Sequence, residues 1–348
     1  MKKLFITLLF LMLSVGVAFG GNLKDRGDQD VYGSLTFFKD QTFKGDVDVD
    51  GIINGVVNAS TGKVFFVGPT SASDTSRYGT KKSQPFATLD YAIGQCSSGR
   101  GDFIIILPGH NESLGTGETV VIDVDGISII GIGSGESMQP TFDFDIVATT
   151  FNVQADDVLI ENLWFRASIS AASGVDLDDE SSGITIRNCK FSSELNDSTD
   201  EFANAISAGE SVNHLTVEGC VFDAGLQAAV ASIYLREDSK NVTIRNNVFW
   251  GNASIAHINN KNYACQRLLI DSNIMVNGEG IEGALNGQPC IEVLATTGGV
   301  VCNNFLAAEV TSDTVVVAAD MLMFQNYYTE QEGGDKTAGL AGASNIAD

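Results

Sequence analysis

The segment Ile244-Arg245-Asn246-Asn247-Val248-Phe249 is one of seven six-residue segments that align with one another without gaps. These segments, called hexads below, begin at Ile160, Ile186, Val217, Ile244, Ile270, Val301 and Met323. Successive starts are separated by between 22 residues (Val301 to Met323) and 31 residues (Ile186 to Val217). A recurring unit of that size indicates a solenoid, because each unit buries its apolar face only against its neighbours.

Two positions of the hexad form distinct columns. Position 4 holds Leu163, Cys189, Cys220, Asn247, Asn273, Asn304 and Asn326, and position 6 holds Phe165, Phe191, Phe222, Phe249, Met275, Leu306 and Tyr328. Successive turns of a coiled parallel sheet lie about 4.8 Å apart. An asparagine at position 4 can therefore donate to the amide one rung above and accept from the one below. It also tolerates the left-handed backbone of a tight bend. Position 6 is expected to fill the inside of the coil.

Each unit also contains an earlier strand, in which apolar and polar residues alternate as expected for one buried face. Val175 and Leu177 belong to such a strand, and the polar turn 178–182 separates it from the next hexad. A rung thus consists of a strand, a polar turn, a second strand, a bend and a third short strand. The pattern predicts an all-β protein, a single-stranded parallel β-helix of about eight to ten rungs, over residues 63–330.

The two ends of this region differ from the rungs in their predicted structure. A short amphipathic capping helix is predicted at about residues 85–95, with Pro85 in its first turn and Leu89 and Ile93 on one face. A solenoid must cover its exposed end, and this helix suits that task. The last residues, 331–348, are rich in glycine and alanine and are expected to form a flexible tail.

The first residues have the pattern of an export signal. Lys2 and Lys3 precede an apolar run that ends near Phe19, so residues 1–20 are predicted to be a signal peptide. A transmembrane anchor is the alternative, although the run is short for a membrane span. We expect a secreted, extracytoplasmic protein that makes no membrane contact after cleavage.

Residues 21–62 alternate apolar residues with polar residues or glycine in short strands that have little core of their own. We expect this segment to be a β-rich stalk or oligomerisation segment that supports a homotrimer. A flexible linker is the alternative.

Charge and cysteines restrict the choice further. The formal net charge of −24 repels nucleic acid, so no nucleic-acid partner is expected. Export permits disulfides among the six cysteines. Cys189 and Cys220 stack in register on adjacent rungs, which favours two buried thiols over a bridge between them.

Segments 84–93 and 101–109, followed by rungs with asparagine bends, resemble the pectate-lyase-like superfamily of right-handed parallel β-helices. The resemblance covers about residues 63–330 and implies that the coil is right-handed. The run from Ile105 through segment 126–133 to Phe142 is similar, more loosely, to virion-associated β-helix proteins of tailed phages and prophages. Those are generally structural, which adds the virion as a location. The signal peptide departs from that pattern.

Candidate site residues are few. A lyase on this fold would need a basic residue that abstracts a proton and acids that bind Ca²⁺. Arg187 and Arg245, at position 2, and Asp178 are the candidates for catalysis, although alternating charge at position 2 is most simply a surface ion ladder. Asp176, Asp178 and Asp179 are the candidates for Ca²⁺, with a solvated turn as the alternative. Trp164, Trp250 and Tyr327 are the candidates for carbohydrate binding, with core packing as the alternative.

The sequence leaves two classes of function. The first is a non-catalytic structural or adhesive β-helix that is exported or virion-borne and binds polysaccharide. The second is a secreted polysaccharide lyase or glycoside hydrolase that acts on acidic glycans. The first is favoured, because no convergent set of acids and bases is evident.

Overall fold

The computed structural model describes residues 62–330, except 116–118, 148, 194–199, 226–228, 261, 279–287, 309–314 and 319, together with strands β1 (Ile52–Ile53) and β2 (Val56–Val57). The chain divides into two compact units, residues 1–54 and 55–348. The predicted signal peptide (1–20) and tail (331–348) lie outside the described residues. The same is true of the predicted stalk (21–62), apart from β1, β2 and Gly62.

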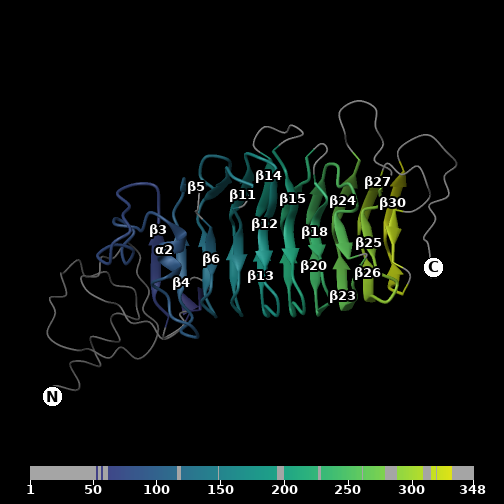
Figure 1. The fold of residues 1–348 in the computed structure, drawn as a ribbon, viewed down its shortest axis with the longest axis horizontal. Coiled ribbons are helices and arrows are strands. Elements are labelled where there is room, and N and C mark those ends of the chain that lie inside the picture. The colour runs from purple at the N-terminus through teal and green to yellow at the C-terminus, as the bar shows by residue number, and fades with distance from the viewer. Residues whose placement is uncertain are drawn as a thin grey trace, which may run out of the picture. The chain divides into compact units, whose positions relative to one another are not determined.

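Three parallel sheets run along the second unit (Figure 1). Sheet 1 contains β3 (Val64–Val67), β4 (Phe103–Ile106), β7 (Ser128–Gly131), β10 (Leu159–Glu161), β13 (Thr185–Arg187), β16 (Thr216–Glu218), β19 (Ser239–Lys240), β20 (Thr243–Arg245), β23 (Cys265–Asp271), β26 (Gly298–Cys302) and β29 (Leu322–Phe324). Sheet 2 contains β5 (Asn111–Leu114), β8 (Thr141–Phe144), β11 (Trp164–Ala167), β14 (Lys190–Ser193), β17 (Val221–Asp223), β21 (Val248–Trp250), β24 (Ile274–Asn277), β27 (Phe305–Ala308) and β30 (Tyr327–Glu330).

Sheet 3 contains β6 (Val120–Ile122), β9 (Phe151–Val153), β12 (Ala171–Leu177), β15 (Phe202–Ala208), β18 (Ala231–Leu235), β22 (Ile258–Asn260), β25 (Ile291–Val293) and β28 (Val316–Val317). From β4 onward the chain visits sheets 1, 2 and 3 in turn, as in β10, β11 and β12. This order makes each turn one rung, so the prediction of an all-β parallel β-helix is confirmed.

The hexads lie in register along the stack. In sheet 1, Ile160 pairs with Ile186, and the pairing continues through Val217, Ile244, Ile270, Val301 and Met323. In sheet 2, position 6 pairs in the same way from Phe165 to Tyr328. The predicted alignment is therefore the alignment of the backbone.

Position 6 fills the inside of the coil. The rings of Phe165, Phe191, Phe222 and Phe249 stack with successive centroid distances of 4.8, 5.0 and 4.7 Å. All four side chains are fully buried. Stacking at the rung spacing lets each ring contact the rings above and below it, so burial and dispersion act together.

The tight bend lies one residue earlier than the sequence analysis assumed. The left-handed backbone occurs at position 3, where φ is between 54° and 64° at Asn162, Asn188, Gly219, Asn246, Ser272, Asn303 and Gln325. The asparagines at position 4 have no positive φ and point into the coil, where Asn247, Asn273 and Asn304 are buried. Position 3 thus provides the turn, and position 4 provides interior hydrogen bonds.

The amides at position 4 bond along the stack. Asn273 Nδ2 donates to Asn304 Oδ1 at 3.0 Å and to the Ile244 carbonyl at 3.0 Å. Its Oδ1 accepts from the backbone N–H and from Nδ2 of Asn247, at 2.9 and 3.1 Å. Asn304 donates to Asn326 in the same geometry. Each buried amide is therefore satisfied, which removes the cost of burying it.

The helix near the N-terminus is shorter than predicted. Helix α2 (Leu89–Ile93) begins after the N-cap residue Thr88. Thr88 still has the extended backbone of the strand-like stretch before it, and its side chain caps the helix. The expected start near Pro85 is wrong, because Phe86 hydrogen-bonds to β3 as a strand residue does. Leu89, Ala92 and Ile93 of α2 are buried, and α2 contacts β3, β4 and β6 at the first rungs. In the described part of the chain no helix is long and apolar enough to cross a membrane.

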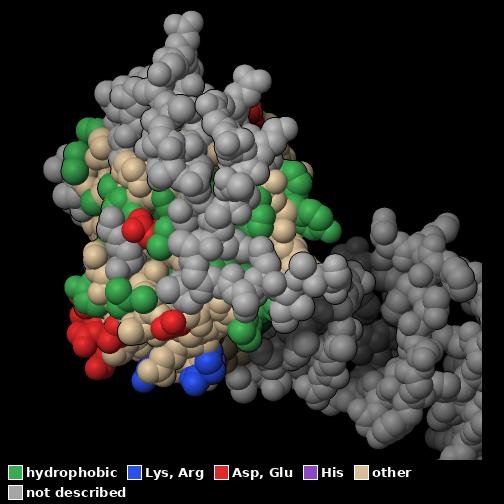
Figure 2. Space-filling view, turned by 90° about the vertical axis from the view of Figure 1, so that its right-hand side faces the viewer, with side chains coloured by type: hydrophobic (Ala, Val, Ile, Leu, Met, Phe, Trp, Pro, Cys, Tyr) green, Lys and Arg blue, Asp and Glu red, His purple; other side chains and the backbone are tan. Residues whose placement is uncertain are grey.

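The outside of the coil changes along its length. Ion pairs line sheet 1 in the middle rungs, whereas exposed apolar side chains occupy the outside of the last rungs. Viewed from the C-terminal end, hydrophobic side chains lie on both flanks, and most of the visible charged ones gather at the lower edge (Figure 2).

Candidate functional site

The most polar outward surface is position 2 of the hexads in sheet 1. Register places Glu161, Arg187, Glu218 and Arg245 on four successive strands. Arg187 Nη2 lies 2.7 Å from Glu161 Oε2, and Arg245 Nη2 lies 2.9 Å from Glu218 Oε2. Each arginine thus pairs with the glutamate on the preceding rung, and the four residues form two separate ion pairs.

An asparagine at position 3 joins each ion pair. Asn188 Nδ2 donates to Glu161 Oε1 at 3.3 Å, and Asn246 Nδ2 donates to Glu218 Oε1 at 3.5 Å. The left-handed backbone at position 3 turns these amides outward beside the carboxylates. Each glutamate therefore accepts from a guanidinium and from an amide of the next rung.

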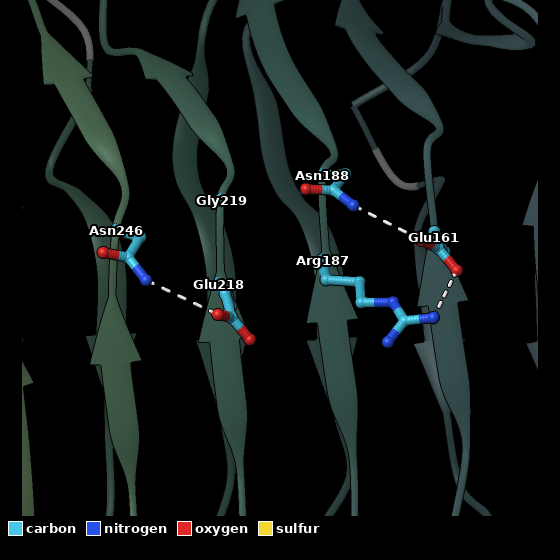
Figure 3. Close-up of a pocket in the computed structure, with 6 residues that line it drawn as sticks. All are labelled: Glu161, Arg187, Asn188, Glu218, Gly219 and Asn246. Atoms are coloured by element: carbon cyan, nitrogen blue, oxygen red, sulfur yellow. Dashed lines mark hydrogen bonds and ion pairs between the residues drawn. The ribbon is translucent and has the colours of Figure 1, made fainter. Parts of the chain in front are cut away.

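An opening separates the two ion pairs. Figure 3 shows the Arg187 and Asn188 side chains leaning toward Glu161, away from Glu218. Gly219 occupies position 3 between them, and an added Cβ would lie 2.6 Å from Asn188 Oδ1. The result is an open depression of about 550 Å³ lined by Glu161, Arg187, Asn188, Glu218, Gly219 and Asn246. It is called the Gly219 groove below.

The groove contains one of the predicted catalytic candidates and lies beside a second. Arg187 lines it, Arg245 is paired to its wall, and Asp178 lies elsewhere, directly after β12. Each guanidinium is paired with a glutamate carboxylate, at 2.7 Å for Arg187 and 2.9 Å for Arg245. The arrangement therefore offers hydrogen-bond donors and acceptors, and its charges neutralise one another in pairs.

The predicted Ca²⁺ ligands Asp176, Asp178 and Asp179 lie on β12 and directly after it. Asp176 faces outward on sheet 3, where burial raises the pKa of its carboxyl although Arg236 Nη2 lies 3.5 Å away. Asp179 Oδ1 accepts from the Glu210 backbone N–H at 2.8 Å. Among the residues that the structure describes, no three histidine, cysteine or acidic side chains form a metal site.

The acids of the turns have a structural use that the sequence analysis missed. Asp125 accepts from the Asp156 N–H at 3.0 Å, Asp156 from the Ser182 N–H at 2.8 Å, and Asp238 from the Ala264 N–H at 2.8 Å. Each carboxylate thus ties its turn to the turn of the following rung. The sequence contains a signal for this role, because these aspartates recur at about the rung interval.

Of the three predicted carbohydrate-binding aromatics, two are open to a ligand. Trp164 is 7% exposed, Lys190 Nζ lies 4.0 Å from its ring centroid, and its Nε1 donates to Ser192. Trp250 and Tyr327 are 47% and 67% exposed on the outside of sheet 2. The cation–π contact makes Trp164 part of the packing rather than a platform.

The six cysteines are free thiols, and five of them are buried. Burial raises the pKa of the Cys290 thiol to about 12 and that of Cys189 well above its usual value. A thiol acts as a nucleophile only when it is ionised. These side chains therefore serve packing.

No protein-family model matches the chain, and no curated protein matches it. Among solved structures, pectate lyase Pel9A is 14% identical over 82% of this chain and 80% of its own, with a TM-score of 0.41. A rhamnogalacturonan lyase is 12% identical over 82% of this chain and 88% of its own, with a TM-score of 0.42.

A third match is a tailspike protein mutant of E. coli bacteriophage HK620 in complex with a pentasaccharide. It is 14% identical, with a TM-score of 0.38, and the match covers 77% of this chain and 49% of the tailspike. The chain thus spans about half the tailspike's length. At these identities and TM-scores, none of the three likenesses bears on what the Gly219 groove does.

Proposed function

We propose that the protein is a non-catalytic, adhesive β-helix, exported or virion-borne, that binds a glycan in the Gly219 groove. The observation that carries this proposal is the lining of the groove: two amides, the Glu161–Arg187 ion pair and Glu218, which pairs with Arg245 outside the lining, beside a position without a side chain. Such a lining can form many hydrogen bonds, and its paired charges are poorly suited to proton transfer.

The chemistry of the groove fits sugar hydroxyls. A hydroxyl both donates and accepts, so it can bond to a carboxylate or an amide oxygen on one side and to an amide N–H on the other. Asn188, Glu218 and Asn246 place such groups on three successive rungs, spaced by roughly 4.8 Å. Because the net charge is −24, a neutral glycan fits better than a polyanion.

The test is to add a side chain at position 3 of the groove, which keeps the left-handed bend, fills the groove and displaces the Asn188 amide. Gly219→Asn places at this position the residue that already occupies it on the two neighbouring rungs. We expect the full chain to bind a subset of an immobilised panel of neutral oligosaccharides, and Gly219→Asn to weaken that binding at least tenfold. Ser272→Asn is the matched control, since Ser272 has the same left-handed backbone outside the groove.

The proposal fails if no oligosaccharide of the panel binds, or if Gly219→Asn and Ser272→Asn bind equally well. Folding of both variants is checked by circular dichroism and thermal melting.

The second candidate is a polysaccharide lyase. Its support is the outward position of Arg187 and Arg245 on sheet 1, beside the groove. We expect no unsaturated products from uronate-containing polymers. If such products formed and Arg187→Ala abolished them, the lyase would replace the non-catalytic proposal.

A further inference from the structure

A second surface lies on the outside of the last rungs, away from the groove. Ile274, Phe305 and Tyr327 are aligned on successive strands of sheet 2. Leu322 and Phe324 lie on β29 of sheet 1, joined to β30 by the bend at residues 325 and 326. These five residues are called the C-terminal apolar surface.

This surface is unusually open for such side chains. Leu322 is 68% exposed and Phe305 is 50% exposed, and all five residues are among the exposed large hydrophobic residues of the described chain. Half-exposed side chains of this size present on the order of 100 Å² each. Together the five side chains expose on the order of 500 Å² of apolar area, comparable to the largest apolar patch of a typical monomer, and such patches are often functional.

We propose that the C-terminal apolar surface packs against the same surface of a second copy of this chain. Two such surfaces would bury on the order of 1,000 Å² in total, which is at the lower limit for a specific protein–protein interface. The half-exposed Val300 and Ala307, on the same outward faces, add to the five residues. An interface of this size gives a concentration-dependent dimer rather than an obligate one.

A second copy of this chain supplies an equal set of exposed apolar side chains.

A glycan is a poor occupant of this surface. Among its five side chains only Tyr327 carries a hydrogen-bonding group. Sugar hydroxyls that pack on such a surface would lose their bonds to water without replacement. An identical apolar surface meets no such cost, and a twofold axis makes the contact self-complementary.

The test is the mass of the full chain in solution. We expect light scattering after gel filtration to show a monomer–dimer equilibrium that shifts toward the dimer with concentration. Added salt should favour the dimer, because each copy carries a net charge of −24 and salt screens their repulsion. The double variant Leu322→Ser/Tyr327→Ser should need at least tenfold more protein to reach half dimer.

Ile132→Ser is the matched control, because Ile132 is a comparably exposed apolar residue at the first rungs. It should dimerise like the unaltered chain. Ile274→Lys is a second variant, in case the double variant loses its fold. Ile274 lies on β24, two strands inside the end of sheet 2, and points outward.

Three results would overturn the proposal. The unaltered chain could remain a monomer at all concentrations. Folded Ile274→Lys and Leu322→Ser/Tyr327→Ser could associate like the unaltered chain, which would place the contact elsewhere, as in residues 21–62. Deletion of residues 331–348 could turn a monomer into a dimer, which would mean that this segment covers the surface.

Discussion

The middle rungs, from Ile160 to Trp250, and the C-terminal rungs, from Ile270 to Glu330, differ in the side chains that dominate their columns. In the middle rungs the inside is aromatic and the outside of sheet 1 carries ion pairs. In the C-terminal rungs asparagine amides bond through the interior, and phenylalanine, leucine and tyrosine face outward.

The difference between the two regions shows that the repeat preserves its backbone and not the polarity of its side chains. Every hexad keeps the same register and the same left-handed position 3, whatever the polarity of its columns. A column is stable if each member has a matching member on the next rung. Rings stack on rings, amides bond to amides, and carboxylates pair with arginines.

The largest expected effect is in the aromatic interior. Phe222 lies between Phe191 and Phe249, with interplanar angles of 6° on both sides, and is fully buried. We expect Phe222→Ala to lower the free energy of unfolding by about 3–5 kcal/mol, because it removes two stacking contacts and leaves a cavity. Urea denaturation followed by circular dichroism measures the change.

The control for this prediction is Val221→Ala on the same strand, because Val221 faces outward and is partly exposed. Its effect should be within about 0.5 kcal/mol. Equal losses for the two variants would mean that the inside and the outside of the coil have been confused.

The border between the two regions contains a buried histidine. His257 contacts the Phe249 ring, and its Nδ1 and Nε2 lie 2.9 Å from Ser232 Oγ and the Val276 carbonyl oxygen. Because a carbonyl only accepts, Nε2 is the donor, and the neutral ring is satisfied. Burial lowers the pKa of His257 from 6.5 to about 4.

Acid should therefore destabilise the fold through His257. Between pH 6.5 and about 4 the unfolded chain binds a proton at this position that the folded chain does not bind, so stability falls as the pH falls. At ~1.4 kcal/mol per pH unit the loss is on the order of 3 kcal/mol. Urea denaturation at several pH values should show a smaller loss for His257→Gln than for the unaltered chain.

His214→Gln is the comparison variant, since His214 is exposed in a turn. It should keep the full acid sensitivity. Identical pH profiles for His257→Gln and the unaltered chain would contradict the assignment.

The amide interior of the C-terminal rungs should respond more moderately. Asn273→Leu removes the acceptor of two Asn247 donors and the donor to Asn304. We expect a cost on the order of 1–3 kcal/mol for each buried group left without a partner. Asn246→Gly, one position before Asn247, keeps the left-handed bend and should cost much less in the same urea denaturation. Similar costs for the two variants would show that the interior amides contribute little.

The sequence was sufficient for the rungs because their columns repeat. Seven hexads give the register of two sheets directly, and the sheet 3 strands follow as far as Ile291. At the last rung Val316 aligns with Ile291, and the two-residue strand β28 is too short to show an alternation of apolar and polar residues. The start of α2 was misplaced because Asp74 and Thr88 position it through side-chain contacts that no local pattern reveals.

The candidate site was only partly predictable. Position 2 identified Arg187, Arg245 and Glu218, yet pairing each arginine with the preceding rung needed the side-chain geometry. The groove depends on Gly219, where a side chain is missing from a row of outward polar residues. In the aligned hexads, the glycine at position 3 indicates a gap in the outer surface only if position 3 is already known to face outward.

The smallest effect is expected for a substitution that gives a middle rung the asparagine found at position 4 of the C-terminal rungs. Cys220 occupies position 4 directly before Asn247, and its backbone N–H already donates to Asn247 Oδ1 at 2.8 Å. In Cys220→Asn the new Nδ2 could bond to that oxygen and to the Ile186 carbonyl, which Cys220 Sγ now contacts at 3.6 Å. The free energy of unfolding should therefore change by less than about 1.5 kcal/mol, as for a volume-conserving exchange.

Cys220→Asp has nearly the same shape but places a carboxylate, without a donating amide, at a fully buried position. It should be clearly less stable than Cys220→Asn in urea denaturation at neutral pH. That difference would show that the amide column can be extended by one rung from Asn247, because Asn247 supplies the hydrogen-bond partner. If the two variants lost the same stability, the thiols of the middle rungs would be required for their size alone.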